Sequence, residues 1–142
     1  MNIAEYNGVW VFAEQRNGEL QKVSLEILGE GRRLADELGV NLTAVLLGNN
    51  VACLADILGE HGADEILVAE HEELENYTTD GYTKVLCDLA SERKPGILFI
   101  GATFIGRDLG PRVAARLSTG LTADCTSLEV DVTNGDLLAT RP

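Results

Sequence analysis

The 142-residue chain has the length of one compact domain, and its 45% hydrophobic content is enough for a core that needs neither metals nor disulfides. Its 23 acidic and 11 basic residues include no long basic run, which argues against nucleic acid and anionic membranes as partners. Three widely spaced cysteines (Cys53, Cys87 and Cys125), no secretion signal and no membrane-spanning run predict a soluble cytoplasmic protein with buried thiols. We expect residues 1–142 to form a single domain.

Short β-rich runs alternate with longer segments of helical period, a pattern typical of a mainly parallel sheet covered by crossover helices. These runs are almost continuously apolar, as in strands that are buried on both faces. They are Val9–Ala13, Leu42–Leu47, Glu65–Ala69 and Ile97–Gly101. We therefore place all four in one central sheet of a three-layer α/β fold.

Amphipathic segments between and after these strands predict the helices. They are Lys22–Leu38, Val51–His61, Thr79–Glu92 and Gly106–Leu117. In the first of them, Leu34 and Leu38 belong to the expected buried face. Gly29 and Gly31 are expected on its solvent face, where each glycine costs about 1 kcal/mol relative to alanine.

The end of the sequence changes character and indicates a C-terminal β-hairpin. Residues Thr126–Val132 alternate apolar and polar side chains, as in a half-buried strand. Asn134-Gly135 follows, and this dipeptide between extended runs is the strongest short hairpin signal. Leu137 and Leu138 would begin the second strand.

The segment from Gly101 to Leu117 follows a buried strand and opens a helix, which is where open α/β sheets bind ligands. The free N–H groups at such a helix start favour anions. The spacing of Gly101 and Gly106 is that of a P-loop, but Arg107 and Asp108 stand where that motif needs Lys and Ser or Thr. We interpret Asp108 instead as a capping residue at the helix start.

Three arginines, Arg107, Arg112 and Arg116, gather on this helix in an otherwise acidic chain. Two interpretations stay open, because the arginines could meet an acidic partner surface or pair with the chain's own carboxylates. Polar residues follow shortly after the helix. The candidate interface with another subunit or domain comprises Arg107, Asp108, Arg112, Arg116, Thr122, Asp124 and Thr126.

The sequence contains no catalytic constellation, no dinucleotide fingerprint and no spacing typical of a metal site. His61 and His71 have no serine or cysteine partner nearby, and we expect both on the surface. The aromatic residues lie in or beside apolar runs, so we expect them to pack rather than to stack on a flavin or a base. They include Tyr77, Tyr82, Phe99 and Phe104.

The helix-opening block resembles the best-marked part of electron transfer flavoprotein alpha subunits. It reads GATFIGRDLGPRVAARL from Gly101 to Leu117 and TGLTADCT from Thr119 to Thr126. The runs VWVFAE (9–14), SLEILGEGRRLADELG (24–39) and GADEILVAE (62–70) resemble the family too. The resemblance therefore covers most of the chain and implies a Rossmann-like or adenine-nucleotide-hydrolase-like α/β domain.

The resemblance also implies a function. It implies the N-terminal scaffold domain of the alpha subunit of a heterodimeric electron carrier, which accepts electrons from dehydrogenases such as acyl-CoA dehydrogenases and has no active site of its own. The partner would be the beta subunit. In this family FAD is held by a C-terminal domain of the alpha subunit, and the sequence ends at Pro142, so no cofactor is expected in these residues.

Two alternatives stay open at this point. One is a stand-alone adenine-nucleotide-binding protein of the universal-stress type, with AMP or ATP held near Ala13–Glu14 and Gly101–Thr103. The other is an α/β interaction module that binds no ligand. Nucleotide retained by the purified protein would favour the first alternative.

Overall fold

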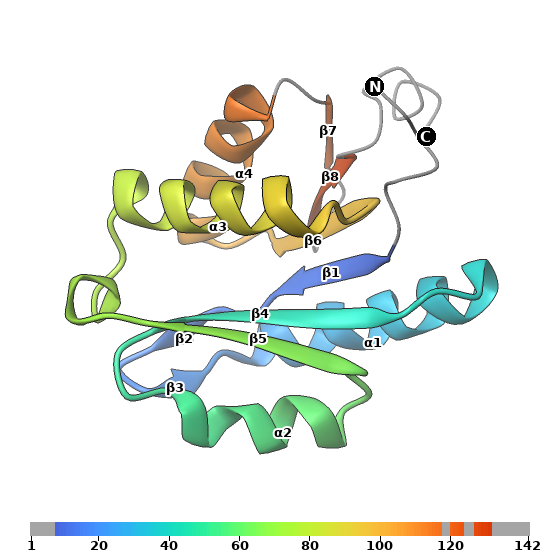
Figure 1. The fold of residues 1–142 in the computed structure, drawn as a ribbon, viewed down its shortest axis with the longest axis horizontal. Coiled ribbons are helices and arrows are strands. Elements are labelled where there is room, and N and C mark those ends of the chain that lie inside the picture. The colour runs from blue at the N-terminus through green and yellow to red at the C-terminus, as the bar shows by residue number, and fades with distance from the viewer. Residues whose placement is uncertain (1–7, 118–119, 124–126, 132–142) are drawn as a thin grey trace.

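The computed structural model describes residues 8–117, 120–123 and 127–131 (Figure 1). Its main sheet has six strands in the order β5-β4-β1-β6-β8-β7. The strands are β1 (Val9–Phe12), β4 (Leu42–Gly48), β5 (Glu65–Glu70), β6 (Ile97–Gly101), β7 (Gly120–Ala123) and β8 (Ser127–Asp131). Neighbours among β5, β4, β1 and β6 run parallel, whereas β8 pairs antiparallel with both β6 and β7. The prediction that one sheet contains all four apolar runs is confirmed.

Helices cover both faces of this sheet and give three layers, as predicted (Figure 1). The helical elements are α1 (Lys22–Leu38), the 3₁₀ turn η2 (Ala52–Leu54), α2 (Ala55–Glu60), the 3₁₀ turn η3 (Glu72–Leu74), α3 (Thr79–Arg93) and α4 (Phe104–Arg116). Successive side chains of β1 point to opposite faces of the sheet, so they pack in two separate cores. Val11 packs in the core that contains residues of α1 and α2, and Phe12 packs in the core that contains residues of α3 and α4.

Strand β5 differs from its prediction as a strand buried on both faces. It is the outer strand of the sheet, and its residues are half-buried or exposed, whereas every residue of β4 is buried. A nearly continuous apolar run indicates a strand, but it does not tell an edge strand from a central one.

The buried face of α1 is rotated relative to its prediction. Leu38 is 55% exposed, and Gly31 is buried where the helix meets the sheet. A Cβ at Gly31 would lie 2.8 Å from Val11 Cγ2 and 2.9 Å from Leu42 Cδ1, so only glycine permits this close approach. The expectation of a solvent-facing Gly31 is therefore wrong, whereas Gly29 does face open space.

A small hairpin directly after β1 was not expected from the sequence. Strands β2 (Gln15–Arg16) and β3 (Glu19–Leu20) pair antiparallel around Asn17 and Gly18. Both turn residues have positive φ, 54° and 79°, which is the geometry that an Asn-Gly hairpin turn needs. The predicted strand over residues 126–132 is present as β8, but the predicted Asn134-Gly135 turn lies outside the described residues.

The structure describes two of the three cysteines. Cys87 is buried in α3, and burial raises the pKa of its thiol, but Cys53 is exposed in η2, so the expectation of a buried thiol is wrong there. Cys125 lies outside the described residues. No helix in the described part of the chain is long and apolar enough to cross a bilayer.

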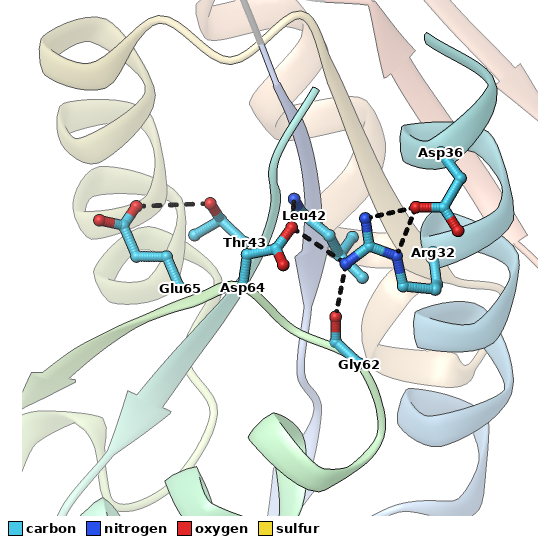
Figure 2. Close-up of polar contacts among 7 residues, drawn as sticks. All are labelled: Arg32, Asp36, Leu42, Thr43, Gly62, Asp64 and Glu65. Atoms are coloured by element: carbon cyan, nitrogen blue, oxygen red, sulfur yellow. Dashed lines mark hydrogen bonds and ion pairs between the residues drawn. The ribbon is translucent and has the colours of Figure 1, made fainter. Parts of the chain in front are cut away.

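Arg32 ties α1 to the amino ends of β4 and β5 (Figure 2). Its Nε and Nη2 donate to Asp36 Oδ1 at 3.1 and 2.7 Å. Its Nη1 donates to the Gly62 carbonyl at 2.8 Å and to Asp64 Oδ2 at 2.9 Å. Asp64 Oδ2 also accepts the N–H of Leu42 at 2.9 Å, and this N–H, followed by Arg32, lowers the pKa of Asp64.

Replacing Asp64 by alanine is expected to lower the free energy of unfolding by about 1 kcal/mol, because the Leu42 N–H loses its acceptor. The side chain of Asp64 is 42% exposed, so solvent screening keeps the charge contribution small. The lowered pKa means that this contribution is complete above the ordinary carboxyl pKa and is lost as pH falls through the folded-state pKa. Urea denaturation at neutral and acidic pH measures it.

The matched control is Asp88→Ala, which removes an exposed carboxylate whose hydrogen-bond partner in the described part of the chain is Lys84 on the same helix. The difference between wild type and Asp64→Ala should shrink at acidic pH. A difference that stays constant would contradict the stabilising role of the ionised Asp64.

Candidate functional site

The direction in which the sheet is built reverses between β1 and β6. The chain leads from β1 to β4 and β5 on one side and then returns to β6 on the other side of β1 (Figure 1). Open α/β sheets bind ligands at such a reversal. The structure therefore brings together the two segments named for a nucleotide, Ala13–Glu14 after β1 and Gly101–Thr103 at the end of β6.

The side-chain carboxylate of Glu14 lies between these two segments. Its side chain is 3% exposed, and its Oε1 accepts a hydrogen bond from the Thr103 hydroxyl at 2.5 Å. Its Oε2 lies 3.3 Å from Arg16 Nη2, and Ser24 Oγ donates to its backbone carbonyl at 2.7 Å. A phosphate at this helix start would meet a buried carboxylate, which opposes anion binding.

Thr103, not Asp108, caps helix α4. The helix begins at Phe104, two residues before its predicted start, and the Thr103 hydroxyl accepts the N–H of Gly106 at 3.0 Å. The capping role expected for Asp108 is therefore wrong. Its position one turn further along follows from the earlier helix start.

Asp108 instead connects α4 to the start of α3. Its Oδ2 accepts hydrogen bonds from Thr79 Oγ1 at 2.5 Å and from the Tyr77 hydroxyl at 2.6 Å, and these bonds lower the pKa of Asp108. Burial, with the neighbouring Asp108 carboxylate, raises the pKa of Tyr77 to about 12. Tyr77 therefore keeps its proton and remains a donor at physiological pH.

Gly106 makes the contact between α4 and β6 possible. A Cβ at this position would lie 1.7 Å from the Gly101 carbonyl oxygen, far inside van der Waals contact. Gly106 thus serves the close packing of α4 on β6, whereas a Cβ at Gly101 would lie 2.8 Å from Val23 Cγ2 of α1.

The three arginines of α4 differ in their partners. Arg112 Nη2 pairs with Asp80 Oδ1 at 2.8 Å, which fits the interpretation of pairing with the chain's own carboxylates. Arg107 Nε donates to the Ala102 carbonyl at 3.3 Å, and among the described residues neither Arg107 nor Arg116 has a carboxylate partner. Both are exposed.

The remaining members of the candidate interface follow α4. Thr122 lies on β7, whose backbone alone is described. Asp124 and Thr126 lie outside the described residues. Their expected interface role stays a prediction.

A cavity of about 390 Å³ lies near the carboxyl end of β1 and the start of α4. The β2–β3 hairpin, the segment before α3 and the first turn of α4 form its walls. The lining residues are Gln15, Arg16, Asn17, Glu75, Asn76, Tyr77, Phe104 and Ile105. Sequence reasoning missed this cavity, although the Asn17-Gly18 turn and the apolar pair that opens α4 were visible signals.

Phe104 also corrects the expectation that the aromatic residues pack inside. It is 89% exposed, whereas Tyr82 and Phe99 are buried as expected. Tyr77 is half-buried and contacts Tyr82 edge to face, with ring centroids 5.0 Å apart. The exposed ring of Phe104 is thus an unusual feature of this surface.

Both histidines are exposed, as predicted. His71 Nδ1 accepts the N–H of Glu73 at the start of η3, and His61 Nδ1 lies 2.8 Å from the Ile57 carbonyl. Within residues 8–117, 120–123 and 127–131, no group of three or more His, Cys, Asp and Glu side chains is arranged to hold a metal ion. The contacts of both histidines are with backbone atoms of neighbouring residues.

The fold is an open, mainly parallel α/β domain in which the carboxylate of Glu14 is buried where the strand order reverses. Residues 9–142 match the electron transfer flavoprotein domain, and the chain belongs to this family. The chain spans about two fifths of the length of the curated relatives that it matches.

Three relatives illustrate the similarity. Protein FixB of Clostridium saccharobutylicum is 78% identical over 142 residues, which are 100% of this chain and 42% of the relative. Electron transfer flavoprotein subunit alpha of Clostridium acetobutylicum is 70% identical with the same coverage. The acryloyl-CoA reductase electron transfer subunit beta of Anaerotignum propionicum is 55% identical over 131 residues, which are 92% of this chain and 36% of the relative. The resemblance to alpha subunits is confirmed.

Proposed function

We propose that residues 1–142 are the N-terminal scaffold domain of the alpha subunit of a heterodimeric, FAD-containing electron carrier. The observation that carries this proposal is the 70% identity over the whole chain to a protein named electron transfer flavoprotein subunit alpha. In this proposal the carrier accepts electrons from dehydrogenases in the cytoplasm and passes them on. The relative named for acryloyl-CoA reductase supports donors or acceptors that act on CoA thioesters.

The proposed domain holds no redox group and contributes structure instead. Glu14 is buried at the strand-order reversal, where open α/β folds place a ligand, which supports a scaffold role rather than nucleotide binding. FAD would be held by the part of the alpha subunit that follows these residues. It would supply the electron transfer, and residues 1–142 would position its domain against the partner.

The surface around α4 is the proposed interface with the beta subunit or with the flavin domain. It comprises Arg107, Asp108, Arg112, Arg116, Thr122, Asp124 and Thr126. Arg107 and Arg116 support this proposal best, because both are exposed cations without a carboxylate partner among the described residues. Arg112 is already paired with Asp80, and Asp108 holds Tyr77 and Thr79.

A yellow heterodimer is the expected result when the full-length alpha subunit is purified with the product of its neighbouring gene. Absorbance after gel filtration should show stoichiometric FAD, because the flavin domain is present. Residues 1–142 expressed alone should be colourless while circular dichroism shows an intact α/β fold. A colourless full-length complex, or stoichiometric flavin in residues 1–142 alone, would contradict the proposal.

A further inference from the structure

We propose that the cavity beside Phe104 is a docking site for a segment of the partner subunit that presents an apolar side chain flanked by carboxylates. We call this cavity, with its lining residues given above, the Phe104 pocket. The inference rests on the proposed function and specifies how the partner is held. The Phe104 pocket has a volume of about 390 Å³, which is large enough for one or two bulky side chains.

Exposure of Phe104 is the first argument. Three other large apolar side chains are exposed in the described part of the chain, namely Leu38, Ile57 and Val68, on three different elements. Phe104 is the most exposed of the four and lines a cavity together with Tyr77 and Ile105. Single exposed apolar residues are normal, whereas an aromatic cluster at a hollow is typical of an interface anchor.

Two residues that line the Phe104 pocket, Tyr77 and Gln15, are held by contacts within the chain. The Tyr77 hydroxyl donates to Asp108, and the Tyr77 ring packs on Tyr82. On the opposite wall, Gln15 Nε2 donates to the Leu47 carbonyl at 3.1 Å, and Gln15 Oε1 accepts the Gly18 N–H at 3.0 Å. A rigid pocket binds with a smaller loss of conformational entropy than a mobile one.

Charges of both signs lie at the pocket, because Arg16, which is paired with Glu14, and Glu75 line it. Further cations lie on α4. Arg107 lies one helical turn after Phe104, and Arg116 lies further along the same helix. Neither has a carboxylate partner among the described residues, although the chain has a net charge of −12. These cations attract carboxylates of another polypeptide, whereas a second copy of this chain would bring the same net charge and be repelled.

Kinetics of association between full-length alpha subunit and its partner subunit test the proposal. Phe104→Ala is expected to speed dissociation roughly ten- to hundredfold at every salt concentration, because the lost contact is apolar. Phe104→Leu should retain most of the affinity. Leu38→Ala removes an exposed apolar side chain elsewhere and should leave both rates unchanged.

Charge reversal gives the second arm of the same experiment. Arg107→Glu should slow association at low salt about three- to tenfold, and the effect should fade at high salt. The control is Arg33→Glu, an equal charge change on α1, which is in the opposite layer (Figure 1). Phe104 and Arg107 are both exposed, so circular dichroism and melting temperature should stay unchanged.

Each outcome decides between the two proposals. Wild-type rates for Phe104→Ala with an intact heterodimer would overturn the docking site and leave the proposed function standing. No heterodimer with the wild-type chain would contradict both. Sedimentation velocity that shows a wild-type homodimer lost in Phe104→Ala would identify a second copy as the occupant and overturn the proposal.

Discussion

Replacing Gly106 by alanine is expected to lower the free energy of unfolding by about 3 kcal/mol or more, a large part of the stability of a domain this size. The new Cβ would overlap the Gly101 carbonyl oxygen at 1.7 Å and would also approach Ile100 Cγ2 at 3.1 Å. The carbonyl belongs to backbone inside the sheet and cannot rotate away. Helix α4 would have to move off β6, which would disturb the core beneath it. Urea denaturation followed by far-ultraviolet circular dichroism measures the loss.

Gly29→Ala is the matched control for this prediction. Gly29 lies inside α1 with open space where the alanine methyl group would go, so alanine should stabilise the protein by about 0.5–1 kcal/mol through helix propensity. Opposite signs for the two glycine-to-alanine changes are therefore expected. A small loss at Gly106, similar in size to the effect at Gly29, would show that α4 does not pack on β6 as described.

Replacing Glu14 by alanine is expected to lower the free energy of unfolding by about 2–3 kcal/mol. The change removes the acceptor of the Thr103 hydroxyl and the carboxylate beside Arg16, and it leaves a void in a site where Glu14 is almost fully enclosed. Because Thr103 caps α4, the first turn of that helix should loosen as well. Hydrogen exchange of the Gly106 amide, with urea denaturation, measures both effects.

Glu14→Gln is the conservative control, since its amide oxygen still accepts the Thr103 hydroxyl. It should cost less than Glu14→Ala. Calorimetry of the wild-type chain with AMP is the functional counterpart, because the buried carboxylate should exclude phosphate. A micromolar dissociation constant, equivalent to about −8 kcal/mol, would contradict this role of Glu14 and favour the nucleotide-binding alternative.

The layered fold could be predicted from the sequence because its signals are local. The apolar runs of β1, β4 and β6 and the amphipathic period of α1 each lie within one short window. The Asn17-Gly18 turn was also a local signal, identical in type to Asn134-Gly135, but its flanking strands are only two residues long. Such short strands have no periodicity to support a turn signal.

The site could not be predicted to the same extent, because its contacts join residues far apart in the chain. Glu14 and Thr103 are separated by 89 positions, and Tyr77 and Asp108 by 31. The sequence marked residues 101–108 as a helix start, but α4 begins two residues earlier than expected, so that Thr103 and not Asp108 caps it. Helix boundaries are the least certain part of any sequence prediction.

The outer position of β5 has a consequence for solubility during synthesis. Among the described strands none pairs with its far edge, and its sequence EILVAE is the kind of short apolar segment that can stack into cross-β fibrils. Two copies that met along this edge in antiparallel register would place Glu65 of one opposite Glu70 of the other. Like charges directly opposite each other destabilise a strand pair. The glutamates at the two ends of β5 should therefore disfavour this pairing of one edge with another.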